Sequence, residues 1–551
     1  MEAKFLTPIQ LWADFNPIKD SLDLSYIKSE STGGYVKKGV YFTSENAPDG
    51  KARIYAESVS GDDNKKKPAM IIIGGIKDTI NTKFLEYAAD CGYIAVSCDY
   101  SAVYQYPSKY PESLKRAEYL NAANILDRAE PSAKETPWFV WAKALRRLIS
   151  VMYEDPLFDR ENVGVIGIGE GAILMWQLAA MDGRVKAAAS LLGSEGISYL
   201  TKPKYSPDTK MEIDESKVNW QAAVSAEAYA RFLQCPVLLV NATNSSSSAF
   251  DITEDIIGLI PQEIPYGIIN CPRLSACITA SDMGSIKKWF HACLKKGAFP
   301  KSPELKYEEV DGKLRISVNA DQSRKIKEVL LYYSYGEINP RFRNWIAAEM
   351  VKKENYELIL DIYNNDIRHY VFANVFYHEN LTLSTPEVSF VPEDLTIIPT
   401  QAIKQRIIYD SGMGTDTFTV GCGNIVLPDG EPHLAKSNDQ ILGITVLQGS
   451  LVNYKLGDVR IFREEDSILQ LDAFSKEDRE IEIIITSLDG SKATEYTTAA
   501  ALSGGEKWHK LSFFSHDFKT AEMHPLKDWQ GVRKLEIKNA AGILFNNIIW
   551  V

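Results

Sequence analysis

The distribution of histidine limits the chemistry that the first half of the chain can perform. Nucleophilic hydrolysis by a serine needs a nearby base to accept the hydroxyl proton, and near neutral pH histidine does this work. The first 290 residues contain no histidine, and His291 lies in the apolar stretch 288–292, which has the pattern of a helix. The seven histidines are His291, His369, His378, His433, His509, His516 and His524.

Cys277 is the alternative nucleophile that the sequence offers, with Arg273 as the basic residue close to it. A thiol near its ordinary pKa attacks poorly unless a base or a positive charge stabilises the thiolate. One neighbouring arginine is a weak signal, so we interpret Cys277 as a buried and inert cysteine. The seven cysteines are odd in number and mostly lie in apolar strands or helices, which favours reduced, buried thiols over a disulfide framework.

Composition and motifs exclude several classes of function. The sequence has no glycine-rich phosphate loop, no Cys or His pairs at zinc spacing and no EF-hand loop, so we expect neither a cofactor nor a metal. A net charge of −12 argues against a nucleic-acid partner, because phosphates are bound by basic surfaces. The N-terminus has no apolar leader and no apolar run reaches membrane-spanning length, so we expect a cytoplasmic chain without membrane contact. The oligomeric state stays open.

The stretch from residue 37 to residue 294 alternates short apolar runs with helical segments. This alternation predicts a parallel sheet with helices on both faces, preceded by a hairpin at 39–43 and 52–58. The strands are expected at 70–73, 93–98, 163–166, 185–192 and 236–240, and the helices at 83–90, 138–153, 171–181 and 285–295.

The alternation stops at a Pro/Gly-rich linker, residues 297–303, and strand patterns follow it. Strands are expected at 325–335, 356–363, 370–377, 480–483, 532–537 and 543–551. A second boundary is expected near 392–399, and the short strands with turn signals suggest β-sandwiches or jelly rolls. We therefore expect three domains: an α/β domain over 1–300, a β-sandwich over 303–392 and a jelly roll over 400–551.

The segment 162–172 resembles the strand, sharp turn and helix of α/β-hydrolases, in which G-x-S-x-G places the nucleophilic serine on the turn. The segments 136–142 and 182–188 are similar to the acetylxylan esterase and dienelactone hydrolase-like branch of that superfamily. The likeness covers roughly residues 30–390. Residues 508–551, with Trp508, Trp529 and Trp550, resemble the end of carbohydrate-binding jelly rolls, although a core role for Trp529 and Trp550 is the simpler interpretation.

The resemblance implies a catalytic triad whose three positions are degenerate in this chain. The nucleophile position is Gly169, which has no side chain to attack with. The acid position, after Asn241-Ala242-Thr243-Asn244, is Ser245, and the nearest carboxylate, Asp251, lies six residues further on. The base position falls at about Ser275. We therefore expect no catalytic residues here.

The floor of the site is retained in the sequence. The resemblance implies that Gly74 and Gly75 and the backbone N–H of Glu170 are placed to bind an oxyanion. The alternative is that both glycines only permit a tight turn. The Glu170 side chain could be read as a replacement catalytic carboxylate, but a helix-cap role is the preferred interpretation.

Three functions are open at this point. The first is a catalytically silent hydrolase-like protein that binds a carbohydrate or another small molecule, or acts as an accessory protein linked to carbohydrate metabolism. The second is a carbohydrate esterase-like hydrolase with an atypical catalytic group. The third is an architectural subunit of a complex.

Overall fold

A nine-stranded sheet forms the N-terminal half of the chain in the computed structural model. The structure describes residues 5–63, 65–193, 199, 202–207, 214–364, 366–397, 399, 404–421, 434–436 and 442–551. The strand order is β1-β2-β3-β5-β4-β6-β7-β8-β9; β1, β2, β3 and β5 pair antiparallel in turn, and the six strands from β5 to β9 run parallel. The strands are β1 Ser25–Thr32, β2 Tyr35–Ala47, β3 Gly50–Gly61, β4 Lys67–Ile73, β5 Ile94–Cys98, β6 Phe158–Ile168, β7 Val185–Leu191, β8 Val237–Ala242 and β9 Tyr266–Cys271.

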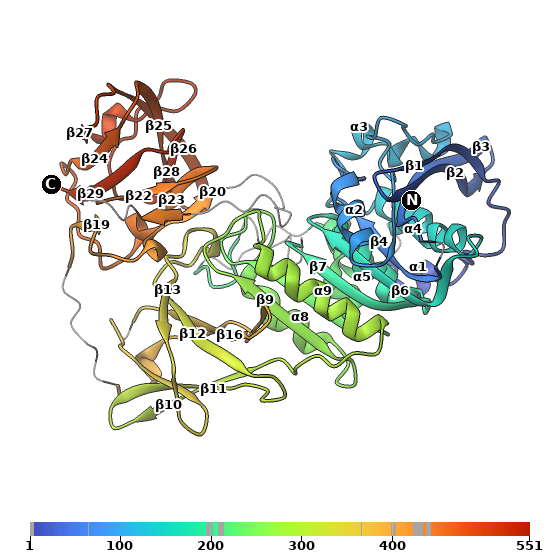
Figure 1. Ribbon diagram of the computed structural model, residues 1–551, viewed down its shortest axis with the longest axis horizontal. Coiled ribbons are helices and arrows are strands. Elements are labelled where there is room, and N and C mark those ends of the chain that lie inside the picture. The colour runs from blue at the N-terminus through green and yellow to red at the C-terminus, as the bar shows by residue number, and fades with distance from the viewer. Residues whose placement is uncertain are drawn as a thin grey trace.

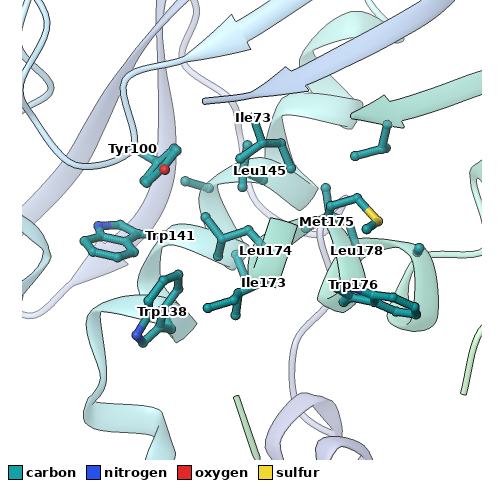
Figure 2. Packing of buried hydrophobic residues seen from close by; sticks show 14 of the residues in the cluster. Ile73, Tyr100, Trp138, Trp141, Leu145, Ile173, Leu174, Met175, Trp176 and Leu178 are labelled. Carbon is teal, nitrogen blue, oxygen red and sulfur yellow. The ribbon is translucent and has the colours of Figure 1, made fainter. Parts of the chain in front are cut away.

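Helices cover both faces of this sheet. Buried strands of a parallel sheet are apolar on both sides, and β4 shows this: Ile71 and Ile73 pack in one cluster with α4 and α5, while Met70 and Ile72 pack in another with α2 and α9. Figure 2 shows the first cluster, where Trp138 and Trp141 of α4 face Ile173 and Leu174 of α5. The helices are α1 Pro8–Trp12, α2 Thr82–Asp90, α3 Tyr119–Ala122, α4 Pro137–Met152, α5 Gly171–Met181, α6 Glu215–Ala223, α7 Ala226–Ala230, α8 Thr253–Leu259 and α9 Ala280–Leu294.

Two antiparallel sheets follow in the middle of the chain and enclose one apolar cluster, which includes Leu314, Val329 and Val375. One sheet has the order β10-β11-β15-β14. The other has the order β13-β12-β16-β17, with β18 also paired to β16. The strands are β10 Glu304–Val310, β11 Lys313–Asn319, β12 Ile326–Tyr335, β13 Ile346–Glu349, β14 Val351–Lys352, β15 Tyr356–Leu360, β16 His369–Tyr377, β17 Leu381–Ser384 and β18 Val388–Phe390.

A second pair of antiparallel sheets ends the chain, at the opposite end of the molecule from the N-terminal strands (Figure 1). The orders are β21-β22-β29-β24-β27, with β19 on β29, and β20-β23-β28-β25-β26. The strands are β19 Ile407–Tyr409, β20 Thr419–Gly421, β21 Leu434–Lys436, β22 Ile444–Val446, β23 Ser450–Asn453, β24 Leu469–Ser475, β25 Arg479–Asp489, β26 Lys492–Leu502, β27 Lys507–Phe513, β28 Val532–Lys538 and β29 Leu544–Trp550.

The expected fold class is confirmed: a mostly parallel sheet with flanking helices is followed by antiparallel sheets of the β-sandwich kind. Trp529 and Trp550 lie in the core between the C-terminal sheets, whereas Trp508 is 39% exposed. Within the described residues, no helix is both long enough and apolar enough to cross a membrane.

Candidate functional site

The turn between β6 and α5, where the nucleophile position is expected, carries a glycine in the left-handed region. Gly169 has φ +55°, in the left-handed region, and its N–H donates to the Leu191 carbonyl at 3.0 Å. A Cβ built on Gly169 would meet no atom within 4 Å, so the position faces open space. A Cβ on Gly171 would collide with the carbonyl oxygens of Ile73 and Gly74, so α5 approaches β4 closely only because residue 171 is glycine. The turn is therefore tight, and residue 169 presents no side chain to the space in front of it.

The two floor glycines lie beside a carboxylate. A Cβ on Gly74 would collide with the Asp78 carbonyl oxygen, so the tight turn does require glycine there. Glu170 is the N-cap residue of α5, as expected, although its side chain makes no capping hydrogen bond. Its Oε2 instead lies 3.0 Å from the position that a Cβ on Gly75 would take. A carboxylate beside these backbone donors opposes the build-up of negative charge that an oxyanion site must stabilise.

The loop after β8, where the acid is expected, makes hydrogen bonds within its own turn and with the middle sheets. Ser245 is 2% exposed, and its Oγ accepts hydrogen bonds from the N–H groups of Ser247 and Ser248, each at 3.1 Å. The side-chain amide of Asn244 donates to the Arg341 carbonyl at 3.2 Å and to the Arg343 carbonyl at 3.0 Å. The acid position therefore belongs to a docking loop for the middle sheets.

Asp251, the carboxylate nearest in sequence to the expected acid position, forms a buried ion pair with Arg343. Arg343 is 0% exposed and contacts both oxygens of Asp251, with Nη2 at 2.9 Å from Oδ2. The same guanidinium donates to Glu387 Oε2 at 3.0 Å. Burial raises the pKa of Glu387 well above its usual range, and the neighbouring Asp251 adds to the increase while Arg343 opposes it. This cluster joins the N-terminal unit to the middle sheets.

The loop after β9, where the base is expected, contacts the C-terminal sheets. Arg273 has φ +65°, its N–H donates to Thr243 Oγ1 at 2.8 Å, and its guanidinium donates to the Asp416 carbonyl. Ser275 lines a cleft of about 550 Å³ together with residues of the C-terminal sheets. The loop after β8 thus contacts the middle sheets, and the loop after β9 contacts the C-terminal unit.

Cys277, in the same loop, is buried as expected but is disulfide-bonded. The expectation of reduced thiols throughout is therefore wrong at this position, although the five other described cysteines are free. A sulfur engaged in a disulfide supplies no thiolate, so Cys277 is not a displaced nucleophile. Disulfides persist mainly in oxidising compartments, so this bond does not support the expected cytoplasmic location.

Sequence reasoning did not find the contacts that the loops around Gly169 make with the middle sheets. Asn244 and Arg343 are separated by 99 residues, and nothing in either local pattern signals their contact. Among the residues that the structure describes, no group of three or more His, Cys, Asp or Glu side chains is placed to hold a metal.

Comparisons with known proteins found distant structural similarity only. No family model and no curated protein matches the sequence. Among solved structures, acetyl xylan esterase 1 from Thermoanaerobacterium sp. JW/SL YS485 is 17% identical, with a TM-score of 0.35 over 46% of this chain and 83% of its own. The acetyl xylan esterase from Paenibacillus sp. R4 is 11% identical, with a TM-score of 0.39 over 50% of this chain and 91% of its own. A putative dienelactone hydrolase from Klebsiella pneumoniae subsp. pneumoniae MGH 78578 is 16% identical, with a TM-score of 0.31 over 43% and 87%. At these values no statement about activity follows from the likeness.

Proposed function

We propose that this chain is a catalytically silent α/β-hydrolase-like protein that acts as a ligand-binding or accessory protein in carbohydrate metabolism. The observation that carries the proposal is the turn at Gly169, which has the backbone conformation of a nucleophile turn but no nucleophile. Attack on an ester needs a nucleophile, a base and an oxyanion site acting together. In this chain the nucleophile position is Gly169, and the Glu170 carboxylate lies beside Gly75 of the expected oxyanion site.

The loops around the turn support the same proposal. Asn244 and Asp251 bind the middle sheets, and Arg273 binds the C-terminal sheets, so these loops now hold the units together. These contacts support a second candidate function, an architectural role in which the chain only provides interfaces within a complex. The cleft beside Ser275 favours ligand binding over that candidate, because a purely architectural junction needs no open, polar cavity.

An ester-hydrolysis assay tests the proposed absence of catalytic activity. The purified chain is incubated with p-nitrophenyl acetate and with an acetylated xylo-oligosaccharide, beside Gly169→Ala and an unrelated protein of similar size. We expect release of acetate no faster than with the unrelated protein. Turnover well above that background, lost in a folded Gly169→Ala variant, would contradict the proposal.

A restoration experiment asks whether the alignment of the three positions is right. The triple variant Gly169→Ser, Ser245→Asp, Ser275→His places all three triad side chains on the loops that the resemblance implies. We expect slow but measurable acyl transfer from the triple variant, and none from Gly169→Ser with Ser245→Asp alone. Equal activity in the double and triple variants would show that position 275 does not face the turn.

A further inference from the structure

The buried cluster between the N-terminal unit and the middle sheets has more carboxyl groups than cations. Arg343 contacts both oxygens of Asp251, and its Nη1 also donates to Glu387 Oε2 at 3.0 Å. The side chains of Arg343, Asp251 and Glu387 are 0%, 1% and 4% exposed. One guanidinium therefore meets two carboxyl groups. If both of them were ionised, the cluster would hold an excess negative charge out of contact with water.

The guanidinium of Arg343 has no further N–H group to offer. Its Nε donates to the Glu337 carbonyl at 3.0 Å, and its Nη2 donates to the Ile338 carbonyl at 3.1 Å as well as to Asp251. Together with the two bonds of Nη1, these bonds use all five N–H groups of an arginine. Asp251 receives two of them and Glu387 receives one. Glu387 is thus the carboxyl group whose charge is less completely matched.

Glu387 and Asp251 are also in hydrogen-bond contact with each other. Ionised carboxylates only accept hydrogen bonds, so a bond between two carboxyl groups requires a proton on one of them. Burial raises the pKa of Glu387 well above its usual range; Arg343 opposes the increase and Asp251 adds to it. The geometry of the cluster and the direction of this shift agree on Glu387 as the group that carries the proton.

Among the described residues, the other cations near the cluster are engaged elsewhere. Lys204 acts on Glu387 and lowers its pKa, but less than the groups named above raise it. The Lys204 Nζ lies 2.7 Å from Asp255, so that carboxylate is its ion-pair partner. The guanidinium of Arg368 lies over the ring of Tyr205, at 4.3 Å from the centroid. Neither cation replaces the proton on Glu387.

The remaining groups around the cluster are aromatic. The guanidinium lies over the ring of Tyr370, at 3.4 Å from the centroid. Burial raises the pKa of both Tyr205 and Tyr370, so both phenols stay neutral near pH 7. Phe250, Trp345 and Phe372 pack in the same apolar cluster as Tyr370. Such surroundings stabilise an ion poorly, so an unmatched carboxylate is disfavoured here.

We infer that Glu387 is protonated in the folded chain, and that its O–H donates to the Asp251 carboxylate and so helps to join the N-terminal unit to the middle sheets. When Glu387 ionises, the proton goes to solvent, this bond is lost, and an unmatched negative charge stays buried. An unperturbed glutamate ionises near pH 4.5, so the unfolded chain loses this proton first as the pH rises. The junction should therefore weaken with rising pH above 4.5, until Glu387 itself ionises.

Urea denaturation from pH 5 to pH 8 tests the inference on the full chain. Glu387→Gln keeps the shape of the acid and a donor toward Asp251 but has no titrating proton. We expect the equilibrium constant for unfolding of the unaltered chain, divided by that of the variant, to rise about tenfold per pH unit, because the folded chain holds one proton more than the unfolded chain. His369 is present in both proteins, so its contribution cancels in this ratio.

Two further variants make the test specific. Asp251→Asn should remove the same pH dependence as Glu387→Gln does, because it leaves one carboxylate for one guanidinium. Glu393→Gln is the matched control, since Glu393 is an exposed carboxylate further along the same segment. The ratio of its unfolding constant to that of the unaltered chain should stay constant. Circular dichroism should show each variant folded.

Infrared difference spectra at pH 6 give a second measurement, which a merely structural role of Glu387 would not change. The band of a protonated carboxyl group should be present in the unaltered chain and in Glu393→Gln, and should be lost in Glu387→Gln. An increase of less than about tenfold in the unfolding ratio between pH 5 and pH 7, or an unchanged band in Glu387→Gln, would overturn the inference. Ester turnover would contradict the proposed function without affecting either measurement.

Discussion

Arg343 and Asp251 form a buried ion pair that joins two segments 92 residues apart, the loop after β8 and the turn before β13. Both side chains are buried, so replacing either residue alone leaves the other one charged and without its partner in an apolar environment. Asp251 is the carboxylate nearest in sequence to Ser245, the expected acid position. In this chain the carboxylate has a structural partner.

Replacing Arg343 by methionine should therefore lower the stability of the junction strongly. We expect a loss of about 3–5 kcal/mol in the free energy of unfolding, because Asp251 is left buried and unpaired. Glu387→Gln should cost less than about 1 kcal/mol, since the raised pKa of Glu387 means that its neutral form is already favoured. Urea denaturation followed by tryptophan fluorescence measures both. Equal losses in the two variants would show that Glu387 contributes as much to the junction as Arg343, against this prediction.

His369 should make stability fall between pH 6.5 and pH 4. It is fully buried beside Tyr335 and Phe390, its Nδ1–H donates to the Ile367 carbonyl at 2.7 Å, and its Nε2 has no partner. Burial lowers its pKa to about 4, against an ordinary value of 6.5, despite the bond to Ile367. The unfolded chain thus binds a proton first as the pH falls, and about 3 kcal/mol of stability is lost by pH 4. Above pH 6.5 this contribution is complete.

Urea midpoints measured from pH 8 to pH 4 check the histidine prediction. His369→Phe keeps the ring packing and should flatten the decline below pH 6.5. His378→Gln, at an exposed position, should leave the decline as it is. The prediction fails if the unaltered chain and His369→Phe decline in parallel.

Gly169→Ser alone should give no esterase activity and should lower stability. No histidine precedes residue 291, and His291 lies exposed on α9, so we expect a serine at 169 to find no histidine base in the N-terminal unit. The backbone at φ +55° suits glycine, and a side chain there costs about 1–2 kcal/mol. Hydrolysis of p-nitrophenyl acetate and the melting temperature measure the two effects. Strong activity from this single change would reveal a base contributed by another part of the chain.

The disulfide at Cys277 predicts a thiol count. With five of the described cysteines free, the denatured and unreduced protein should titrate five thiols, and seven after reduction. Titration with Ellman's reagent in guanidinium chloride gives both numbers. Seven thiols before reduction, in protein purified under air, would contradict the bond.

The proposed division into 1–300, 303–392 and 400–551 predicts where a protease cuts. The middle sheets are tied to the N-terminal unit through the buried Arg343 cluster, whereas their bonds to the C-terminal sheets are fewer, among them Asn344 to Asp458 at 2.7 Å and Arg533 to Glu337 at 2.5 Å. Limited proteolysis should cut first within 392–405 and leave a folded N-terminal fragment. Mass spectrometry of the fragments decides this, and a first cut near residue 300 would contradict the division.

The local pattern of apolar residues was enough to predict the buried strands and the long amphipathic helices. The apolar run 70–73 and the helix expected at 138–153 appear as β4, Lys67–Ile73, and α4, Pro137–Met152. The sharp turn at Gly169, between the strand expected at 163–166 and the helix expected at 171–181, could also be predicted; its role as a nucleophile position stays a prediction. The contacts of Asn244, the pairing of Asp251 and the side-chain position of Glu170 could not, because each depends on a partner distant in sequence. The same holds for Cys277, whose bond depends on three-dimensional proximity.

The conformation at Gly169 has a consequence for the stability of the whole N-terminal unit. A residue with a side chain at φ +55° would strain the backbone, and glycine adopts the same conformation without that strain. A turn without strain leaves the fold more tolerant of destabilising substitutions elsewhere. Asn244 and Asp251, in the loop after β8, bind the middle sheets. Substitutions in this loop would therefore change how the molecule is held together as well as the surroundings of the turn.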